Sequence, residues 1–240
     1  MTLRTGDARF PRTNYKTSRY CVAYLDFLGG TDIIRHDDQN KHLNIINMIF
    51  EDAKKESQIF FQGAFVKIFS DNILLALPTD NDNREQNIKS IVNLVSNFVH
   101  QAADNGYLIR GALTEGDFFH NDIIVYGKAL VQAVEMEEKY AIYPRVIVKK
   151  EIAKLLPQYF YPCADGWNGI NHTIFDFGFD STNFKYTLLS QLSAKKNDVK
   201  VRQKIMWAIT EFNITSNVRR QMGALSHEII TRKEIEDALK

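Results

Sequence analysis

The apolar positions of residues 20–113 switch between two periods, which predicts a strand–helix–strand–strand–helix–strand order. Residues 20–27 are almost continuously apolar and rich in strand formers, and Gly29 and Gly30 then end the run, as expected of a buried central strand. A helix is predicted over about residues 41–56, where apolar side chains recur at i, i+3, i+4 and i+7: Ile46, Ile49, Phe50 and Ala53.

A hairpin and a second helix are predicted next. The apolar segments 65–69 and 73–77 flank a polar tip at residues 70–72, which is typical of a β-hairpin. The longest helical stripe of the chain then covers residues 88–102 and stops before Gly106, a residue that commonly follows a helix end.

With a further strand expected at 107–113, this is the order of a ferredoxin-like α+β core, an antiparallel sheet with both helices on one face. The first strand of that topology lies beside the hairpin, so Asp26 and Asp71 are predicted to meet. Further elements are expected after the core: a strand at 123–126, a helix at 128–140, a strand at 146–148, a loop-rich region at 157–187 with one or two strands, and helix from about residue 198.

Length and charge set the expected organisation. The 240 residues, of which 45% are hydrophobic, suffice for one large core. We expect a polar and basic N-terminal arm over residues 1–19, one α+β domain over 20–190, and a helical extension over 191–240. The formal net charge of +1 gives no reason to expect a nucleic acid polymer or a membrane surface as a partner.

Cysteine usage and the lack of long apolar runs favour the cytoplasm. Only Cys21 and Cys163 occur, so a disulfide framework is not expected. No apolar run approaches the roughly 20 residues that span a bilayer, and the N-terminal stretch lacks the apolar segment of a secretory signal. We therefore expect a cytoplasmic protein without a membrane anchor.

Asp26 and Asp71 carry the strongest chemical signal of the sequence. Asp26 ends an apolar strand and precedes a glycine-containing turn, whose free backbone N–H groups suit phosphate oxygens. A second carboxylate on the hairpin would complete a clamp for two divalent ions about 3.5–4 Å apart, as phosphoryl-transfer chemistry requires. Either aspartate alone is more often a turn or capping residue, so the prediction depends on the pair.

Four sequence blocks follow one another over roughly residues 20–150. They are Leu25-Asp26-Phe27-Leu28-Gly29-Gly30-Thr31; Lys67-Ile68-Phe69-Ser70-Asp71; Arg110-Gly111-Ala112-Leu113-Thr114-Glu115-Gly116; and Tyr126-Gly127-Lys128-Ala129-Leu130 with Ala133, Glu137 and Pro144-Arg145-Val146. In this order the blocks resemble the class III nucleotide cyclases, and within them the bacterial pyrimidine cyclases of the Pycsar antiphage systems; Ser70 stands where Gly is usual, and residues 204–213 show a weaker resemblance. An ordered match is far more specific than a single motif.

The resemblance implies that residues 20–190 are a cyclase catalytic domain, acting as a homodimer with its active sites at the interface. Two Mn²⁺ or Mg²⁺ ions would be held by Asp26, Asp71 and the Phe27 carbonyl. They would activate the ribose 3′-hydroxyl and neutralise the leaving pyrophosphate. A separate effector protein would sense the 3′,5′-cyclic product. The remaining substrate-binding residues would be Phe27, Leu28, Gly29, Gly30, Thr31 and Lys67.

Three departures concern the base and the transition state. Where purine cyclases place a base-reading Asp, a ribose-binding Asn and a phosphate-binding Arg, this sequence has Ile124, Val131 and Glu135. Apolar residues and a carboxylate cannot replace those groups. We therefore expect a pyrimidine substrate, and we prefer UTP to CTP.

The departures also require a replacement cation and a differently built base pocket. Arg110 and Arg145 are the candidates for the cation, and Phe50 on the first helix is expected to shape the pocket together with Ile124. Both arginines have a structural alternative as partners of surface carboxylates such as Glu115 or Glu137.

Other functions stay open at this stage. A catalytically silent cyclase-like module that binds a nucleotide and regulates a partner would equally lack the Asn and the Arg. A diguanylate cyclase or polymerase-palm relative shares the core topology, but its hairpin carries Gly-Gly-Asp/Glu-Glu-Phe, which differs from residues 69–72 here. An RNA-binding module of this topology would need exposed aromatics in a basic context, and the inner strands carry aliphatic residues.

Overall fold

The computed structural model describes residues 15–56, 63–79, 82–171, 181–221 and 229–240. The strands are β1 (Ser18–Phe27), β2 (Phe65–Phe69), β3 (Asn72–Pro78), β4 (Ile109–His120), β5 (Val125–Tyr126), β6 (Val146–Val148), β7 (Phe160–Pro162) and β8 (Asn168–Ile170). The helices are α1 (Gly30–Arg35), α2 (Lys41–Glu56), α4 (Arg84–Asp104), α5 (Lys128–Tyr140), α6 (Lys150–Ala153), α7 (Ser181–Ala194), α8 (Val199–Gln221) and α9 (Arg232–Leu239), with a 3₁₀ turn at Pro157–Tyr159.

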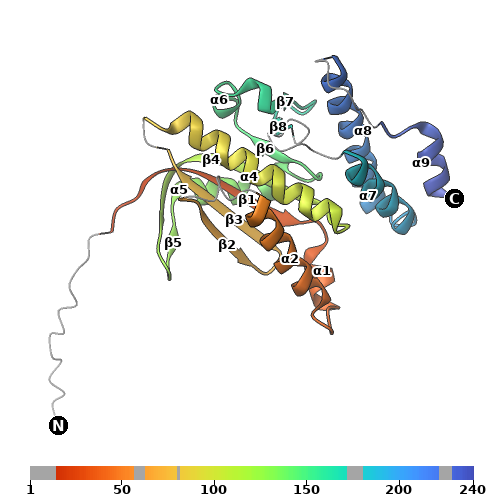
Figure 1. Cartoon of the computed structure of the whole chain (residues 1–240), viewed down its shortest axis with the longest axis horizontal. Helices are drawn as coiled ribbons and strands as arrows, with labels where there is room; N and C mark the ends of the chain where they lie inside the picture. The colour runs from red at the N-terminus through yellow and green to blue at the C-terminus, as the bar shows by residue number, and fades with distance from the viewer. Residues whose placement is uncertain (1–14, 57–62, 80–81, 172–180, 222–228) are drawn as a thin grey trace, which may run out of the picture.

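The predicted ferredoxin-like core is confirmed. The sheet has the order β2-β3-β1-β4-β6-β8-β7; its first four strands pair antiparallel with one another, and β6 pairs parallel with β4. Helices α2 and α4 lie together on one face of this sheet, as the order of elements requires (Figure 1). The chain is therefore a mixed α+β fold in which β6, β7 and β8 widen the core sheet beyond β4.

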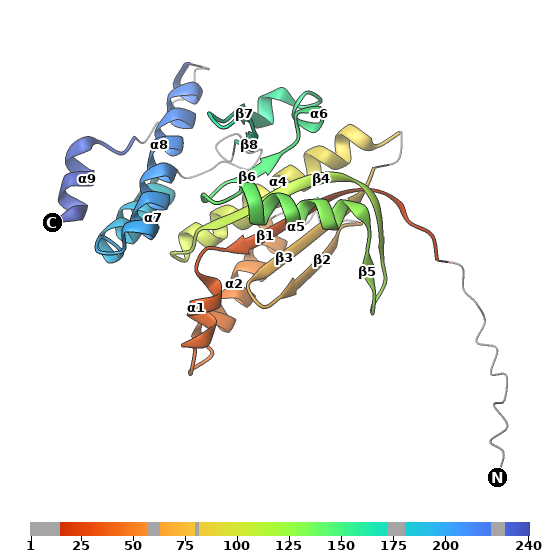
Figure 2. The ribbon, with the colours of Figure 1, turned by 180° about the vertical axis from the view of Figure 1, so that it is seen from behind.

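The two faces of β1 have different environments. Cys21, Ala23, Leu25 and Phe27 are at most 1% exposed and lie in the main apolar cluster under α2 and α4. The alternate positions, which include Asp26, face the side covered by α5 (Figure 2). Strand alternation thus separates a wholly apolar face from the face that carries the polar residues.

The structure differs from the sequence-based expectation at three elements. The short helix α1 begins at the second residue of the glycine pair, Gly30, where only a turn was expected. Strand β4 continues to His120, because it pairs with β1 as far as Ser18 and then with β5. Helix α7 includes residues 181–187, which were expected to be loop-rich, so the expected boundary at residue 190 falls inside a helix.

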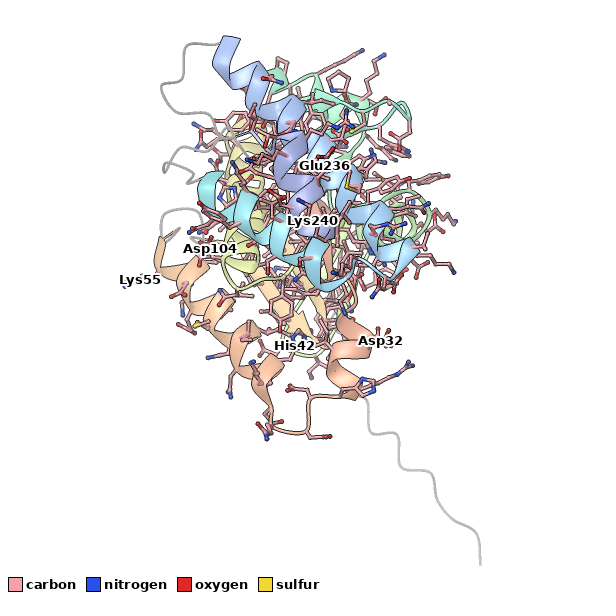
Figure 3. All side chains as sticks on the ribbon, turned by 90° about the vertical axis from the view of Figure 1, so that its right-hand side faces the viewer. Asp32, His42, Lys55, Asp104, Glu236 and Lys240 are labelled. Carbon is pink, nitrogen blue, oxygen red and sulfur yellow. The ribbon has the colours of Figure 1, made fainter. Side chains whose placement is uncertain are left out.

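The C-terminal helices pack around an apolar cluster of their own. Leu188 and Leu192 of α7 and Ile205 and Ile209 of α8 are buried in it. Figure 3 views the molecule from this side and shows α7, α8 and α9 together, with Glu236 and Lys240 on α9. None of the described helices combines the length and the apolar character that crossing a bilayer requires.

Glu115 ties the start of β1 to the start of α4. Its carboxylate accepts hydrogen bonds from Arg84 at 2.8 and 2.7 Å and from Arg19 at 3.1 and 3.2 Å. The hydrogen bonds from Arg84 are the largest influence on the pKa of Glu115, which falls from 4.5 to about 2. The Arg19 and Arg84 pairing therefore fixes Glu115 in its ionised form.

Candidate active site

Asp26 and Arg110 lie opposite each other in the β1–β4 ladder. The Arg110 Nε atom donates to Asp26 Oδ2 at 2.8 Å. The other end of the guanidinium, Nη2, lies 2.8 Å from Oε1 of Glu137 on α5. Arg110 thus bridges a strand carboxylate and a helix carboxylate, the second of which is only 3% exposed.

Burial dominates the electrostatics of this cluster. Burial raises the pKa of Glu137 from 4.5 to about 7, against the opposing effect of the Arg110 charge. Burial also raises the pKa of Asp26, which Arg110 lowers and the charge of Asp71 raises further. One arginine therefore does not compensate for the desolvation of two carboxylates, and the site would gain from a further cation.

Asp71 lies against the turn that follows β1. Its carboxylate oxygens accept hydrogen bonds from the Thr31 hydroxyl and the Asn72 amide, both at 3.2 Å, and its carbonyl accepts from the Phe27 N–H at 3.0 Å. A Cβ added to Gly30 would lie 2.4 Å from the Asp71 Cβ and 2.6 Å from its Oδ2. Only glycine at position 30 lets this carboxylate sit so close to the turn.

In the segment from Phe27 to Thr31, the first residues pack in the core and the later ones present backbone N–H groups that have no partner in their own helix. Phe27 is buried against His42 and Tyr107, and Leu28 donates its N–H to the Leu108 carbonyl at 2.9 Å. Gly29 has a φ of 79°, a left-handed conformation that glycine adopts without strain. The first N–H groups of α1, from Gly30 onward, have no carbonyl within their own helix to bond to.

The donor set of this site fits hard divalent cations. Asp71 is only 7% exposed, yet no cationic side chain within the described residues pairs with it. Its partners there are a hydroxyl and an amide, which cannot neutralise a buried carboxylate. The described ranges contain no group of three His, Cys, Asp or Glu side chains placed to hold a metal, so other ligands must come from backbone carbonyls, water or phosphate.

Lys67 lies on the same face of the sheet as Asp26. Lys67 pairs with Leu74 on β3, and Leu74 pairs with Tyr24 on β1, so these side chains share one row. Lys67 is half-buried in β2, which is the edge strand of the sheet. Strand β3 separates β2 from β1, so Lys67 lies two strands away from the strand that ends in Asp26.

Two of the expected site residues are placed away from the aspartates. Phe50 packs on the other face of the sheet, where its ring stacks on Phe98 of α4 with centroids 6.4 Å apart. Its helical stripe faces the core, and this explains why it cannot line a pocket beside Asp26. Ile124 follows the far end of β4. The ten residues of this strand from Arg110 to His120 span about 33 Å, so Ile124 lies far from Arg110.

Arg145 has a different environment from Arg110. Its guanidinium pairs with Asp165, donates to the Tyr140 carbonyl at 3.2 Å and lies 5.0 Å from the centroid of the Trp207 ring. It is only 3% exposed, and none of its described partners belongs to the Asp26 cluster. The structure thus brings Arg110, and not Arg145, to Asp26.

Sequence reasoning missed two contributors to this region. Glu137 lies in the fourth resembling block and was expected as a surface partner of Arg110 or Arg145, but it was given no place in the site. An acidic residue beside Ala133 and Met136 in an apolar helical stripe is a usable signal of a buried carboxylate. Lys204 of α8 is close enough to Asp26 to lower the pKa of that carboxyl. The resemblance over residues 204–213 is too weak to assign it a role, because its position depends on how α8 packs.

The geometry occurs within a fold shared with solved nucleotide cyclases. The guanylyl cyclase domain of the RhoGC fusion protein from the aquatic fungus Blastocladiella emersonii has a TM-score of 0.53 at 12% identity, over 65% of this chain and 96% of that one. The adenylyl cyclase CyaB from P. aeruginosa has a TM-score of 0.50 at 12% identity, over 65% and 94%.

Sequence comparison adds nothing to this likeness: no family model matches the chain, and the curated proteins give no match. At 12% identity the structural likeness concerns the fold alone. The conclusion from these comparisons is that the chain has the fold of class III nucleotide cyclase domains.

Proposed function

We propose that this protein is a nucleotide cyclase that converts a pyrimidine nucleoside triphosphate into a 3′,5′-cyclic nucleotide and pyrophosphate. The observation that carries the proposal is the convergence of Asp26 and Asp71 beside the turn at residues 29–31, in a fold shared with cyclase domains. A buried carboxylate without a cationic partner in the described residues favours a metal-dependent reaction on a polyanion.

In the proposed complex, the carboxylates bind the metal ions and the turn binds the triphosphate. Asp26, Asp71 and the Phe27 carbonyl would hold two Mn²⁺ or Mg²⁺ ions. When bound, the ions supply acidification of the ribose 3′-hydroxyl and charge neutralisation at the phosphates. Thr31 and the N–H groups at the start of α1 orient the triphosphate, and Gly30 keeps the Asp71 carboxylate close to it.

Arg110 is our candidate for the cation that stabilises the transition state. The O3′–Pα bond forms as the hydroxyl proton passes to solvent water, while the bond from Pα to the bridging oxygen breaks and its electron pair leaves with pyrophosphate. The guanidinium holds Asp26 through Nε, and Glu137 anchors its other end. Once a cation binds Asp26, the Arg110 Nε–H can donate to an α-phosphate oxygen in place of Asp26. The ion pair with Glu137 would keep the guanidinium in position.

The choice of a pyrimidine rests on residues 124, 131 and 135. Ile124 and Val131 offer no hydrogen-bond partner for an adenine edge, and Glu135 carries the wrong charge for a phosphate. We prefer UTP to CTP, and the resemblance to the Pycsar cyclases is to enzymes that act on either pyrimidine. The same resemblance supports a cytoplasmic second messenger in antiphage defence, sensed by a separate effector protein.

A homodimer accounts for the position of Ile124 and for an exposed apolar surface. Ile124 lies too far from Arg110 to contribute to the active site of its own chain, whereas a second copy can bring it there. Ile123 is 86% exposed, Tyr126 68% and Val131 58%, on the β4–β5 hairpin and on α5. Exposed apolar side chains gathered in this way are typical of a protein interface.

One observation favours a silent nucleotide-binding module instead. Asp26 already has Arg110 as a partner, so a cation must compete with a guanidinium for this carboxylate. In a silent module, this ion pair would persist when the nucleotide binds, and no product would form.

A product assay separates the two functions. The purified protein is incubated with ATP, GTP, CTP or UTP and Mn²⁺, and the products are identified by mass. Asp71→Ala is the test variant, and Asp32→Ala is the control, because the Asp32 side chain is 80% exposed on the neighbouring helix. A cyclic pyrimidine from the wild type and the control, but not from Asp71→Ala, supports the enzyme. Nucleotide binding without any cyclic product refutes it.

A further inference from the structure

We propose that Lys204 of α8 contacts the β- and γ-phosphates of the substrate and the leaving pyrophosphate, so that the C-terminal extension completes the active site of its own chain. This inference rests on the proposed cyclase function. It assigns a role to a helix that lies outside the ferredoxin-like core.

Helix α8 shares an apolar cluster with the residues that directly follow β1 and directly precede β4, the two strands that carry the site. Ile205, which follows Lys204, is 1% exposed and shares an apolar cluster with Leu28 and Leu108. Leu28 lies two residues after Asp26, and Leu108 lies two residues before Arg110; the Leu28 N–H donates to the Leu108 carbonyl at 2.9 Å. The packing of Ile205 therefore fixes the start of α8 next to the Asp26–Arg110 pair.

Aromatic contacts set the rotation of α8. The Trp207 ring stacks on Tyr143, with centroids 4.6 Å apart and planes within 10° of each other. The same ring lies 5.0 Å from the Arg145 guanidinium, and the Arg145 carbonyl accepts from the Gly111 N–H at 3.0 Å. Lys204 lies one turn before Trp207 and thus on the same side of the helix, which faces the sheet.

Lys204 is half-buried among groups that belong to the site. Burial and the Arg110 charge lower its pKa, while Asp26, Asp198 and Glu137 raise it. Within the described part of the chain, no carboxylate lies within salt-bridge distance of its ammonium, although Arg110 pairs with Asp26 and Glu137. A half-buried ammonium without an anionic partner is suited to an anionic ligand, and the triphosphate would supply one.

The departure of pyrophosphate requires a cation near the β- and γ-phosphates. When the bond from Pα to the bridging oxygen breaks, negative charge accumulates on pyrophosphate, and a fixed ammonium stabilises that charge without transferring its proton. Arg110 and Lys204 together would supply two positive charges from one chain.

The test compares Lys204→Ala and Lys204→Arg with Lys200→Ala, an exposed lysine one turn earlier on the same helix. We expect Lys204→Ala to lower kcat by roughly 10- to 100-fold and to weaken product inhibition by pyrophosphate about 10-fold. Lys204→Arg should recover most of both, and Lys200→Ala should stay within about 2-fold of the wild type, with thermal unfolding unchanged in all three. Equal kcat and equal pyrophosphate inhibition in the two alanine variants would overturn the inference.

Calorimetric binding of inorganic pyrophosphate, with and without Mn²⁺, keeps the inference separate from the proposed function. If the wild type makes no cyclic product from any nucleotide, the cyclase function fails. Weaker pyrophosphate binding by Lys204→Ala than by Lys200→Ala would still support the phosphate contact. Equal binding by the two variants would refute it, whatever the activity.

Discussion

Glu137 makes the stability of this protein depend on pH in a way that one substitution should remove. Its carboxyl is 3% exposed, and its pKa rises from 4.5 to about 7 in the fold. At about 1.4 kcal/mol per pKa unit, this corresponds to roughly 3 kcal/mol. Because the folded pKa is the higher one, the folded state binds this proton more tightly. The free energy of unfolding therefore falls as the pH rises from about 4.5 to about 7.

Glu137→Gln keeps the size of the side chain and removes its titration. Between pH 4.5 and pH 8, we expect the wild type to lose about 3 kcal/mol more unfolding free energy than the variant does. Urea denaturation followed by circular dichroism, in metal-free buffer with EDTA, measures this difference at both pH values. Glu135→Gln is the matched control, because Glu135 is exposed on the same helix.

The comparison of variant and wild type cancels other titrating groups that the substitution leaves unchanged. A constant difference at the two pH values would refute the reasoning, because it would mean that Glu137 titrates in the fold as it does in the unfolded chain. A shift of similar size in Glu135→Gln would refute it as well, since the effect would then not depend on burial.

Three further substitutions test the geometry. Gly30→Ala should abolish cyclase activity, because its Cβ would clash with Asp71, whereas Gly29→Ala has open space and should cost only about 1 kcal/mol of left-handed strain in a urea melt; equal activity in both would contradict this. Glu115→Gln should lower the unfolding free energy by about 2–3 kcal/mol at pH 7, a gap that closes as the pH falls from about 4.5 to about 2; a gap independent of pH would oppose it. Trp207→Ala should reduce kcat with only about 2 kcal/mol of destabilisation, and Trp207→Phe should retain it; unchanged kcat in the alanine variant would separate α8 from catalysis.

The sequence predicted the parts of the molecule that depend on local periodicity and on topology. β1, α2 and α4 follow from their apolar repeats, and the order of these elements was enough to place Asp26 beside the hairpin that carries Asp71. The pattern failed for α7, where frequent polar residues such as Thr182 and Asn183 obscure the helical stripe.

The roles of individual site residues were harder to predict, because the same residue type can serve either the structure or the site. Phe50 was expected in a base pocket, but an aromatic residue in a helical stripe serves the core, and here it stacks on Phe98. Arg110 and Arg145 were equivalent in sequence; only tertiary packing turns one toward Asp26 and the other toward Asp165. The approach of Lys204 depends on the docking of a whole helix, which no local pattern encodes.

The central claim is that Asp26 and Asp71 hold divalent ions against a triphosphate. A titration with Mn²⁺ followed by electron paramagnetic resonance, in the presence of inorganic tripolyphosphate, counts the bound ions directly. We predict two ions per chain in the wild type and a loss of both in the double variant Asp26→Asn, Asp71→Asn, with Asp32→Asn unchanged. The same number of bound ions in the double variant and in the wild type would contradict the account.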